Sequence, residues 1–284
     1  MNKNFIELGI LLAIVLFATG AAVLAKQRRT AALAASPSQP TNGDWLRGIP
    51  SGKTRIVDLT YALNATTPAW PGDVEPFKAT INASPEKDGY FTRKFAMLEH
   101  YSTHMDAPAH FPPGKLTIDQ IPINRFFGPA VVLDVQAQAA KDENYRLSAV
   151  DVERWESAHG QIPEGAIVLL RTGWSSRWPD AKRYLNMGDT QSMHFPGFSL
   201  EAAKLLAGRK VSGLGTDTMS VDIGASKNYE VHSFALPAGL FQIENLADLS
   251  ALPESGAFII AAPIKLEGGS GGPCRVFAIL PNPS

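Results

Sequence analysis

Residues 99–111 read EHYSTHMDAPAHF, and they predict more about this chain than any other stretch. They hold three of its six histidines, together with one aspartate. Imidazole nitrogens and carboxylate oxygens are the ligands that zinc and similar divalent metals accept. We therefore interpret His100, His104 and Asp106 as metal ligands, with His110 beside them as a proton-transfer residue.

The spacing within this stretch predicts its backbone. His100 and His104 are four residues apart and would share one face of a helical turn, whereas His104 and Asp106 would share a face only in an extended chain. Pro108 disfavours helix at the residue before it. We expect a loop or irregular turn that directs these side chains to one point. Three protein ligands leave a coordination position open, where a metal can lower the pKa of water to about 7.

The remainder of the chain has the pattern of an α/β domain. The segments 148–159 and 200–207 have helical character, and Ser199 is a plausible N-cap for the second. Short apolar runs predict buried strands, and strands that alternate with helices indicate an α/β fold. The predicted strands are 130–135, 166–170, 211–214 and 257–262.

Composition excludes several classes of protein. The chain has 284 residues, of which 45% are hydrophobic and 19% charged, with a formal net charge of −1. A near-neutral chain without a basic stripe gives no reason to expect nucleic acid as a partner. The single cysteine, Cys274, cannot form a disulfide within the chain. We expect an enzyme that acts on a small molecule.

The N-terminus has a different character. Residues 5–25 are apolar apart from Glu7, and small residues, Val23 and Ala25, precede a possible cleavage point. This pattern predicts a signal peptide, or alternatively a retained membrane anchor, and therefore an exported protein that is periplasmic or extracellular. Residues 26–54 are predicted to be a linker, and residues 55–284 one folded domain.

The stretch from His100 to His110 resembles the H-x-G-T-H-x-D-x-P-x-H signature of the cyclase-type metal-dependent hydrolases. This family includes bacterial kynurenine formamidase (an arylformamidase) and isatin hydrolase. One fixed position differs, because Ser102 stands where the family has glycine, and serine resists a positive φ. Further blocks that resemble the family are residues 56–60, 67–73, 171–174, 195–198, 215–222 and 243–246.

The resemblance implies a second set of ligands far along the chain. In the formamidases a late histidine, and a glutamate twelve residues on, join the shared aspartate around a second metal, and here His232 and Glu244 have that spacing. The resemblance thus implies one or two divalent ions, zinc or manganese, with Asp106 between them. It also implies a single swivelling β/β/α domain with a mixed sheet, a homodimer or larger homo-oligomer, and a substrate-binding role for Trp70.

The function that follows is hydrolysis of an amide C–N bond by metal-activated water. The substrate would be an aryl formamide or a cyclic amide such as isatin. Export argues against N-formylkynurenine, because tryptophan breakdown is cytosolic. Two alternatives stay open: a hydrolase of lactones or other cyclic esters, and a non-catalytic exported protein that binds a metal or ligand.

Overall fold

The computed structural model describes residues 48–189 and 192–281. The predicted signal or anchor segment, residues 1–25, and most of the predicted linker lie outside the described residues. From Gly48 onward the chain forms one compact unit. No helix within the described residues is long and apolar enough to cross a membrane.

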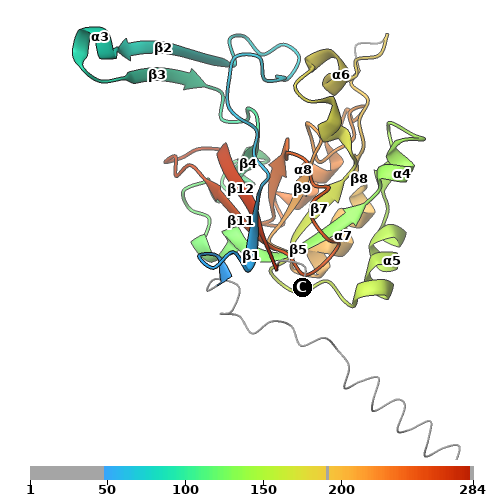
Figure 1. The fold of residues 1–284 in the computed structure, drawn as a ribbon. Coiled ribbons are helices and arrows are strands. Elements are labelled where there is room, and N and C mark those ends of the chain that lie inside the picture. Colours follow the sequence, from blue (N-terminus) through green and yellow to red (C-terminus); the bar gives the residue numbers. More distant parts are fainter. Residues whose placement is uncertain (1–47, 190–191, 282–284) are drawn as a thin grey trace, which may run out of the picture. The chain divides into compact units, whose positions relative to one another are not determined.

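A mixed sheet forms the centre of this unit (Figure 1). Its eight strands follow the order β1-β12-β11-β5-β7-β9-β10-β4, and β4 also pairs with β12, so that the sheet closes into a barrel. β5, β7, β9 and β10 are parallel neighbours, whereas the other pairings are antiparallel. The strands are β1 (Thr54–Asp58), β4 (His104–Asp106), β5 (Phe127–Asp134), β7 (Ile167–Arg171), β9 (Gly213–Thr216), β10 (Phe241–Glu244), β11 (Phe258–Pro263) and β12 (Gly271–Pro281).

The predicted α/β class and mixed sheet are therefore confirmed. The four predicted strands correspond to β5, β7, β9 and β11, with bounds shifted by one to three residues. The apolar runs predicted none of β1, β4, β10 and β12, although residues 56–60 resemble the opening strand of the family and overlap β1. The shorter elements are α3 (Pro85–Asp88), α4 (Gln136–Ala139), α6 (Ala181–Leu185), β6 (Arg146–Leu147), β8 (Gly197–Phe198) and three 3-10 helices, η1 (Pro108–His110), η2 (Ile123–Phe126) and η3 (Trp174–Arg177).

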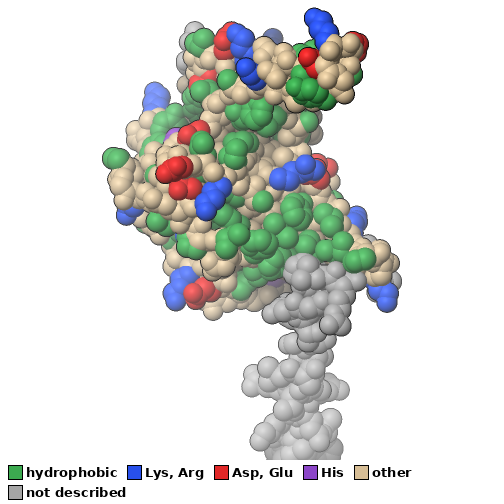
Figure 2. All heavy atoms as spheres, turned by 90° about the vertical axis from the view of Figure 1, so that its left-hand side faces the viewer, with side chains coloured by type: hydrophobic (Ala, Val, Ile, Leu, Met, Phe, Trp, Pro, Cys, Tyr) green, Lys and Arg blue, Asp and Glu red, His purple; other side chains and the backbone are tan. Residues whose placement is uncertain are grey.

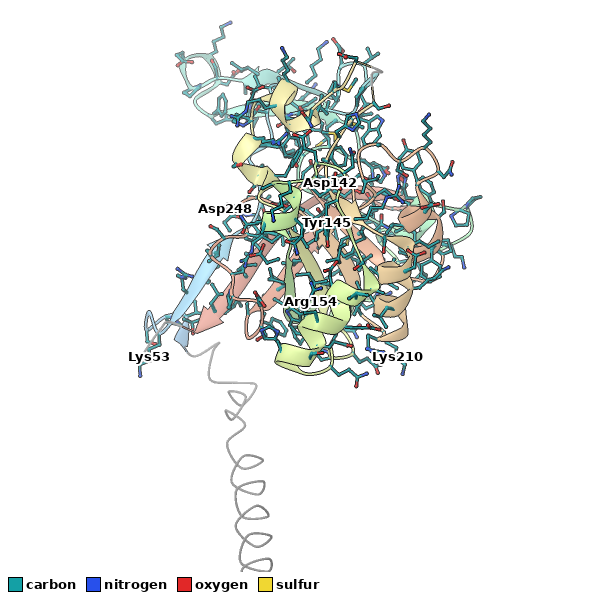
Figure 3. All side chains as sticks on the ribbon, turned by 90° about the vertical axis from the view of Figure 1, so that its right-hand side faces the viewer. Lys53, Asp142, Tyr145, Arg154, Lys210 and Asp248 are labelled. Carbon is teal, nitrogen blue, oxygen red and sulfur yellow. The ribbon has the colours of Figure 1, made fainter. Side chains whose placement is uncertain are left out.

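Helices cover the outer face of the parallel strands. α5 (Ala149–His159) begins at Ser148, which forms a capping box with Asp151, and α7 (Leu200–Gly208) begins at Ser199, whose hydroxyl accepts the Ala202 N–H. Together with α8 (Glu230–Ala235), these helices pack on the strands through a buried apolar cluster. Figure 3 shows this side of the molecule, with Arg154 of α5 on its surface. Both predicted helices and the Ser199 cap are confirmed.

A second apolar cluster fills the inside of the barrel, and it explains the shape of the histidine-rich stretch. Met105 is fully buried in this cluster. The side chains of a strand alternate between its two faces, so His104 and Asp106 point to the opposite side of β4. The prediction of a loop was wrong for these three residues, because β4 pairs with both β10 and β12. Beyond them Ala107 is extended, as expected for the residue before a proline, and the chain turns into η1 at Pro108.

The close approach of β12 to this stretch depends on glycine. A Cβ atom on Gly271 would lie 2.6 Å from Cε1 of His100 and 2.7 Å from the carbonyl oxygen of Met105. Real Cβ atoms do not come so close to other atoms, so a larger residue would push β12 away from β4. The glycine run at 268–272 thus closes the barrel beside the histidines.

One hairpin stands apart from the barrel. β2 (Phe77–Ala83) and β3 (Thr92–Met97) pair only with each other among the described strands and project from the body of the unit (Figure 1). We call this hairpin, residues 77–97, the ribbon. It leads directly into Leu98, Glu99 and His100, and so joins the barrel at the edge of the candidate site.

Candidate metal centre

A cavity of about 570 Å³ lies beside β4 and β10, each of which contributes one residue to its lining, His104 and Glu244. Its polar lining includes five of the six titratable residues that the sequence singled out, all except Asp106: His100, His104, His110, His232 and Glu244. The structure therefore brings His232 and Glu244 to the histidine-rich stretch, although they lie more than 120 residues away along the chain. The register of the sheet explains this, because Glu244 on β10 lies directly opposite His104 on β4.

Asp106 lies at the centre of the cluster. Its Oδ1 atom is 2.7 Å from Nδ1 of His100 and 3.1 Å from Nε2 of His104. Its Oδ2 atom is 3.4 Å from Nε2 of His232 but accepts no hydrogen bond, although Asp106 is almost fully buried. A buried carboxylate oxygen without a donor costs free energy unless a cation binds it. This unpartnered atom and the imidazole and carboxylate donors around it fit a divalent metal.

Glu244 closes the other side of the cluster. Its Oε2 atom lies 3.6 Å from Nε2 of His104, and its Oε1 atom lies 3.4 Å from Nε2 of His232. The backbone N–H of Val221 donates to Oε1 at 3.0 Å and so fixes the carboxylate. Asp106 and Glu244 therefore present oxygens to the same two imidazoles.

Hydrogen bonds outside the cluster orient these two imidazoles. His104 donates from Nδ1 to the carbonyl oxygen of Ser102 at 2.9 Å. His232 donates from Nδ1 to Oδ2 of Asp222 at 2.6 Å. In both residues the proton on Nδ1 leaves the Nε2 lone pair directed at the carboxylates, as metal-binding histidines require.

In His100, by contrast, Nε2 contacts a residue outside the cluster and Nδ1 faces Asp106. Nε2 lies 2.9 Å from the hydroxyl of Ser270, which donates to Oε2 of Glu99 at 2.6 Å. The hydroxyl can therefore accept from Nε2 of His100. This leaves Nδ1, which faces Asp106, as the ring atom of His100 available to a metal.

The candidate ligands fall into two groups that share Asp106. His100, Asp106 and His110 form one, and His104, Asp106 and Glu244 form the other; within each group the potential ligand atoms all lie within 4.8 Å of one another. This division differs from the one that the resemblance implies, because His104 faces Glu244 across the β4–β10 pair. It also places His110 within reach of a metal, a position that spacing alone did not suggest.

The charges in the cluster favour protons on two histidines when no metal is present. Burial lowers the pKa of His104, but the carboxylates of Asp106 and Glu244 outweigh burial and raise it to about 9. Burial opposes the same effect at His232, where Asp106, Asp222 and Glu244 raise the pKa well above its usual value. A metal must displace these protons to bind.

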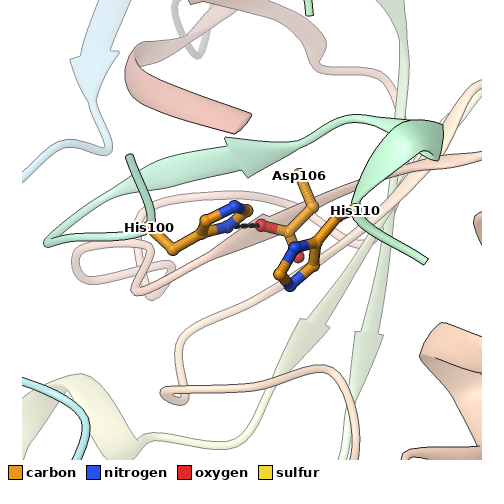
Figure 4. Close-up of side chains that lie close together, drawn as sticks. All are labelled: His100, Asp106 and His110. Carbon is orange, nitrogen blue, oxygen red and sulfur yellow. Dashed lines mark hydrogen bonds and ion pairs between the residues drawn. The ribbon is translucent and has the colours of Figure 1, made fainter. Parts of the chain in front are cut away.

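His110 has a different protonation state. Its ring stacks on His100 with centroids 3.9 Å apart (Figure 4). The centroid of the His232 ring is 6.1 Å from that of His110. Burial lowers the pKa of His110 to about 4, with the charge of Asp106 opposing this shift and the neighbouring histidines adding to it. The ring is therefore neutral at pH 7 and can accept a proton.

Aromatic and apolar side chains form the walls of the cavity. Trp70 packs against Tyr229 with centroids 6.2 Å apart, and Tyr229 packs against Phe111 at 6.0 Å. Leu98 and Met219 line the same cavity. Trp70, the predicted substrate-binding residue, lines this cavity. Phe111 and Tyr229 were missed, because nothing in a local pattern distinguishes a wall residue from one in the core.

Ser102 adopts the conformation that favours glycine. Its φ is +60°, in the left-handed region. Its carbonyl oxygen accepts hydrogen bonds from Nδ1 of His104 and from Nδ2 of Asn245 at 2.9 Å. The serine therefore keeps a backbone geometry that orients His104, and its buried hydroxyl has no hydrogen-bond partner.

A buried cluster of histidines and carboxylates at the floor of an apolar cavity, on an α/β barrel, defines this chain as a metal-dependent amidohydrolase, with a divalent metal as its cofactor. The chain belongs to the Cyclase family ("Putative cyclase"), whose model matches residues 57–223. The resemblance that the sequence suggested is thereby confirmed, and the non-catalytic alternative is not supported.

Two curated relatives have named activities. The isatin hydrolase of Roseibium aggregatum is 33% identical over 247 residues, which cover 81% of this chain and 94% of that protein. The kynurenine formamidase of Salinibacter ruber is 27% identical over 223 residues, which cover 78% of this chain and 95% of that protein.

Two solved structures of isatin hydrolases are similar to this chain in fold. An isatin hydrolase bound to the product analogue thioisatinate has a TM-score of 0.80 at 30% identity and covers 86% of this chain and 99% of its own. Isatin hydrolase A from Ralstonia solanacearum has a TM-score of 0.78 at 37% identity, with the same coverage of both chains.

Proposed function

We propose that this chain hydrolyses the ring amide of a flat, aromatic cyclic amide of the isatin type. The observation that carries the proposal is the buried, unpartnered Oδ2 atom of Asp106, whose carboxylate lies against three imidazoles that line an aromatic-walled cavity. The named activities of the two isatin hydrolases and their similarity to this chain support the choice of a cyclic amide.

The ligands of the metal would be His100, His104, Asp106, His232 and Glu244. A divalent ion bound there supplies Lewis acidity, which lowers the pKa of water and stabilises negative charge on the reacting carbonyl oxygen. The two ligand groups around Asp106 can hold one ion or two, and their nitrogen and oxygen donors suit zinc or manganese.

His110 would move the proton. Its neutral ring takes a proton from the attacking water as the new C–O bond forms at the amide carbon. The C–N bond then breaks, and His110 returns the proton to the leaving nitrogen. The product carries one carboxylate and one aryl amine, so that one water molecule is consumed per ring opened.

The aromatic walls would hold the substrate ring. Trp70 and Tyr229 offer ring faces and edges to a flat ligand, and such contacts add about 0.5 to 1.5 kcal/mol beyond the burial of area. They also exclude water from the reacting carbonyl. We propose substrate binding as the role of Trp70.

The test is a substrate panel with the purified full chain loaded with manganese or zinc. The panel contains isatin, an N-formyl aryl amine and an aromatic lactone. We expect the largest kcat/KM for isatin. A larger value for the formamide or the lactone would replace the proposed substrate, and no hydrolysis of any of the three by the loaded protein would contradict the proposed function.

We also propose that residues 1–25 direct export, which would place the hydrolase outside the cytoplasm. The supporting observation is the apolar segment with small residues before Lys26. Fractionation of the producing cells tests the location, and the mass of the recovered chain tests cleavage. Recovery of the intact chain in the cytoplasm would contradict export.

A further inference from the structure

Carboxylates line the cavity, but no lysine or arginine lines it among the residues that the structure describes. Two of the carboxylates, Asp73 and Glu99, lie outside the two groups of candidate ligands. Arg93, Lys94 and Lys227 lie near lining residues in the sequence, but all three are exposed and none lines the cavity. Figure 2 shows Lys and Arg side chains on the outer surface of the upper part of the molecule, where the ribbon projects. Apart from the metal centre, the fixed charge that a substrate meets in this cavity is therefore negative.

Hydrogen bonds fix one oxygen of Glu99 and leave the other free. Oε2 accepts the hydroxyl of Ser270 at 2.6 Å, the backbone N–H of Ser270 at 2.8 Å and that of Gly271 at 3.3 Å. Oε1 accepts no hydrogen bond from the described part of the chain, although the side chain lines the cavity. A carboxylate that is already oriented loses little conformational freedom when it binds a ligand. Glu99 thus offers a fixed anionic acceptor to a bound molecule.

Glu99 lies on the side of the His100 ring away from Asp106. Nδ1 of His100 faces Asp106 at 2.7 Å. Nε2 of the same ring lies 2.9 Å from the hydroxyl of Ser270, which donates to Glu99. Glu99 is therefore close to the candidate ligands without being one of them. Its charge can act on a part of the substrate other than the reacting amide.

The aromatic walls of the cavity favour the same kind of ligand as the carboxylates. Trp70 and Phe111 both pack against Tyr229, and all three line the cavity. The faces of aromatic rings attract cations, most strongly where water is excluded. Asp73 belongs to the same wall, because its N–H donates to the carbonyl oxygen of Trp70 at 3.1 Å. Aromatic rings beside carboxylates are a combination that binds organic ammonium groups.

The cavity is larger than an unsubstituted bicyclic amide needs. Its volume of about 570 Å³ falls within the range of about 300 to 1,000 Å³ that is typical of sites for drug-sized ligands. Isatin is a fused bicyclic ring without substituents, and it is smaller than such a ligand. The cavity therefore has room for a substituent on the aromatic ring of the substrate.

We propose that Glu99 determines the charge selectivity of this hydrolase, and that its substrate is an aromatic cyclic amide that carries a cationic substituent of the ammonium type. The inference rests on the proposed function, since it requires the amide to react at the candidate ligands. The cation then lies between Glu99 and the aromatic walls, where Asp73 adds to the negative charge. A substrate with an anionic group in that place meets two carboxylates and no basic side chain, so the same cavity rejects it.

The experiment compares substituted isatins as substrates of the purified full chain loaded with manganese or zinc. A trimethylammoniomethyl group and a neopentyl group have the same shape and differ in charge, and a sulfomethyl group is the anionic comparison. Each group is placed at ring position 5 and then at ring position 6. Each kcat/KM is divided by the rate at which hydroxide alone opens the same compound, which removes the electronic effect of the substituent.

The ratio of these values for the cation and its neutral isostere measures the selectivity. We expect a ratio of at least about ten at one of the two positions, with the anion the poorest substrate. Salt screens charges, so the ratio should fall when ionic strength is raised from about 0.01 to 0.5 M. This measurement tests the charge of the cavity without any substitution.

Glu99→Gln keeps the shape of the side chain and removes its charge. We expect it to lower the ratio at least about fivefold. Because the ratio is taken within one variant, an effect of the substitution on His100 cancels. Glu153→Gln is the matched control, because Glu153 is exposed on α5 and does not line the cavity, and it should keep the wild-type ratio. Thermal melting shows whether each variant folds.

Three results would overturn the inference while the proposed function stands. The first is an isatin ring that opens in all compounds with a ratio near one, or with a preference for the anion, at both positions. The second is a preference for the cation that does not change with salt. The third is a preference that a folded Glu99→Gln variant retains in full. If the loaded chain opened none of the isatins, the proposed function would be contradicted, and this inference with it.

Discussion

Asp222 is the buried carboxylate that fixes His232, and the replacement Asp222→Asn tests whether that contact serves metal binding. Oδ1 of Asp222 accepts the N–H of Val231 at 2.9 Å. Oδ2 accepts two donors from His232, its backbone N–H at 3.1 Å and Nδ1 of its ring at 2.6 Å. Asparagine has the same shape, but its NH₂ group faces a donor in either orientation of the amide, and its carbonyl carries no charge.

The expected loss of metal affinity follows from these contacts. Loss of the group that orients a metal-binding histidine typically lowers metal affinity about 10- to 100-fold, which is about 1.4 to 2.7 kcal/mol. We expect a loss in that range for Asp222→Asn. In the metal-free protein, the lost hydrogen bond to a charged acceptor should lower the free energy of unfolding by about 1.5 to 3 kcal/mol.

Competition against a coloured chelator measures zinc affinity in the full chain and its variants at one pH. Asp142→Asn is the matched control, because Asp142 is exposed and accepts a local hydrogen bond from Asn144 in a turn. It should bind zinc as the wild type does. If Asp222→Asn bound zinc within about twofold of wild type while the metal-free protein lost stability, Asp222 would be a purely structural residue and the reasoning would be refuted.

Three further predictions concern the same site. His110→Gln should lower kcat about 100- to 10,000-fold, as expected for loss of a general base, with metal content unchanged; a parallel loss of metal would make His110 a ligand instead. Because the folded pKa of His104 is about 9 against an ordinary 6.5, metal affinity should rise with pH between these values by about tenfold per unit for each proton displaced. The stability that His104 contributes to the metal-free protein should be complete below pH 6.5 and should be lost as pH rises through about 9. Chelator competition and denaturant unfolding across this pH range check both trends, and a flat affinity profile would contradict the first. Ser102→Gly should raise Tm by about 2 to 4 °C, because it relieves a positive φ of about 1 kcal/mol and removes an unpartnered hydroxyl; a lower Tm measured by calorimetry would contradict this.

The local part of the site was predictable from the sequence because its residues lie within one short stretch. Two histidines and an aspartate so close together suggest a metal without any knowledge of the fold. His232 and Glu244 have no such local signal, and only the resemblance to a known family pointed to them. Their position depends on the pairing of β10 with β4, which forms between segments far apart in the chain.

The residues that orient the candidate ligands could not be predicted either, because their role depends on contacts between distant parts of the chain. Asp222, Glu99 and Ser270 are polar residues of common types, and only their contacts distinguish them. Asp222 and Ser270 contact ring nitrogens of His232 and His100, and Glu99 accepts the hydroxyl of Ser270. Tertiary structure alone determines those contacts. The same holds for the walls formed by Phe111 and Tyr229, which a hydrophobicity pattern cannot separate from core residues.

The strands of the fold were also predictable only where the local sequence pattern is long enough. β5 and β7 are continuous apolar runs and were predicted, because their strands are buried on both faces. β4 has only three residues and lies in a polar stretch, so its alternation is too short to be recognised as a strand. Closure of the barrel depends on that short strand and on the glycines of β12, which carry no side-chain periodicity at all.

The most direct test of a metal-dependent amidohydrolase is the rate of isatin ring opening before and after removal of the metal. The purified full chain is treated with a chelator, its metal content is measured, and manganese or zinc is then returned. We predict that the rate falls at least about 100-fold as the metal is removed and recovers when either ion is restored. A protein that contains no measurable metal and opens isatin at its original rate would contradict the account.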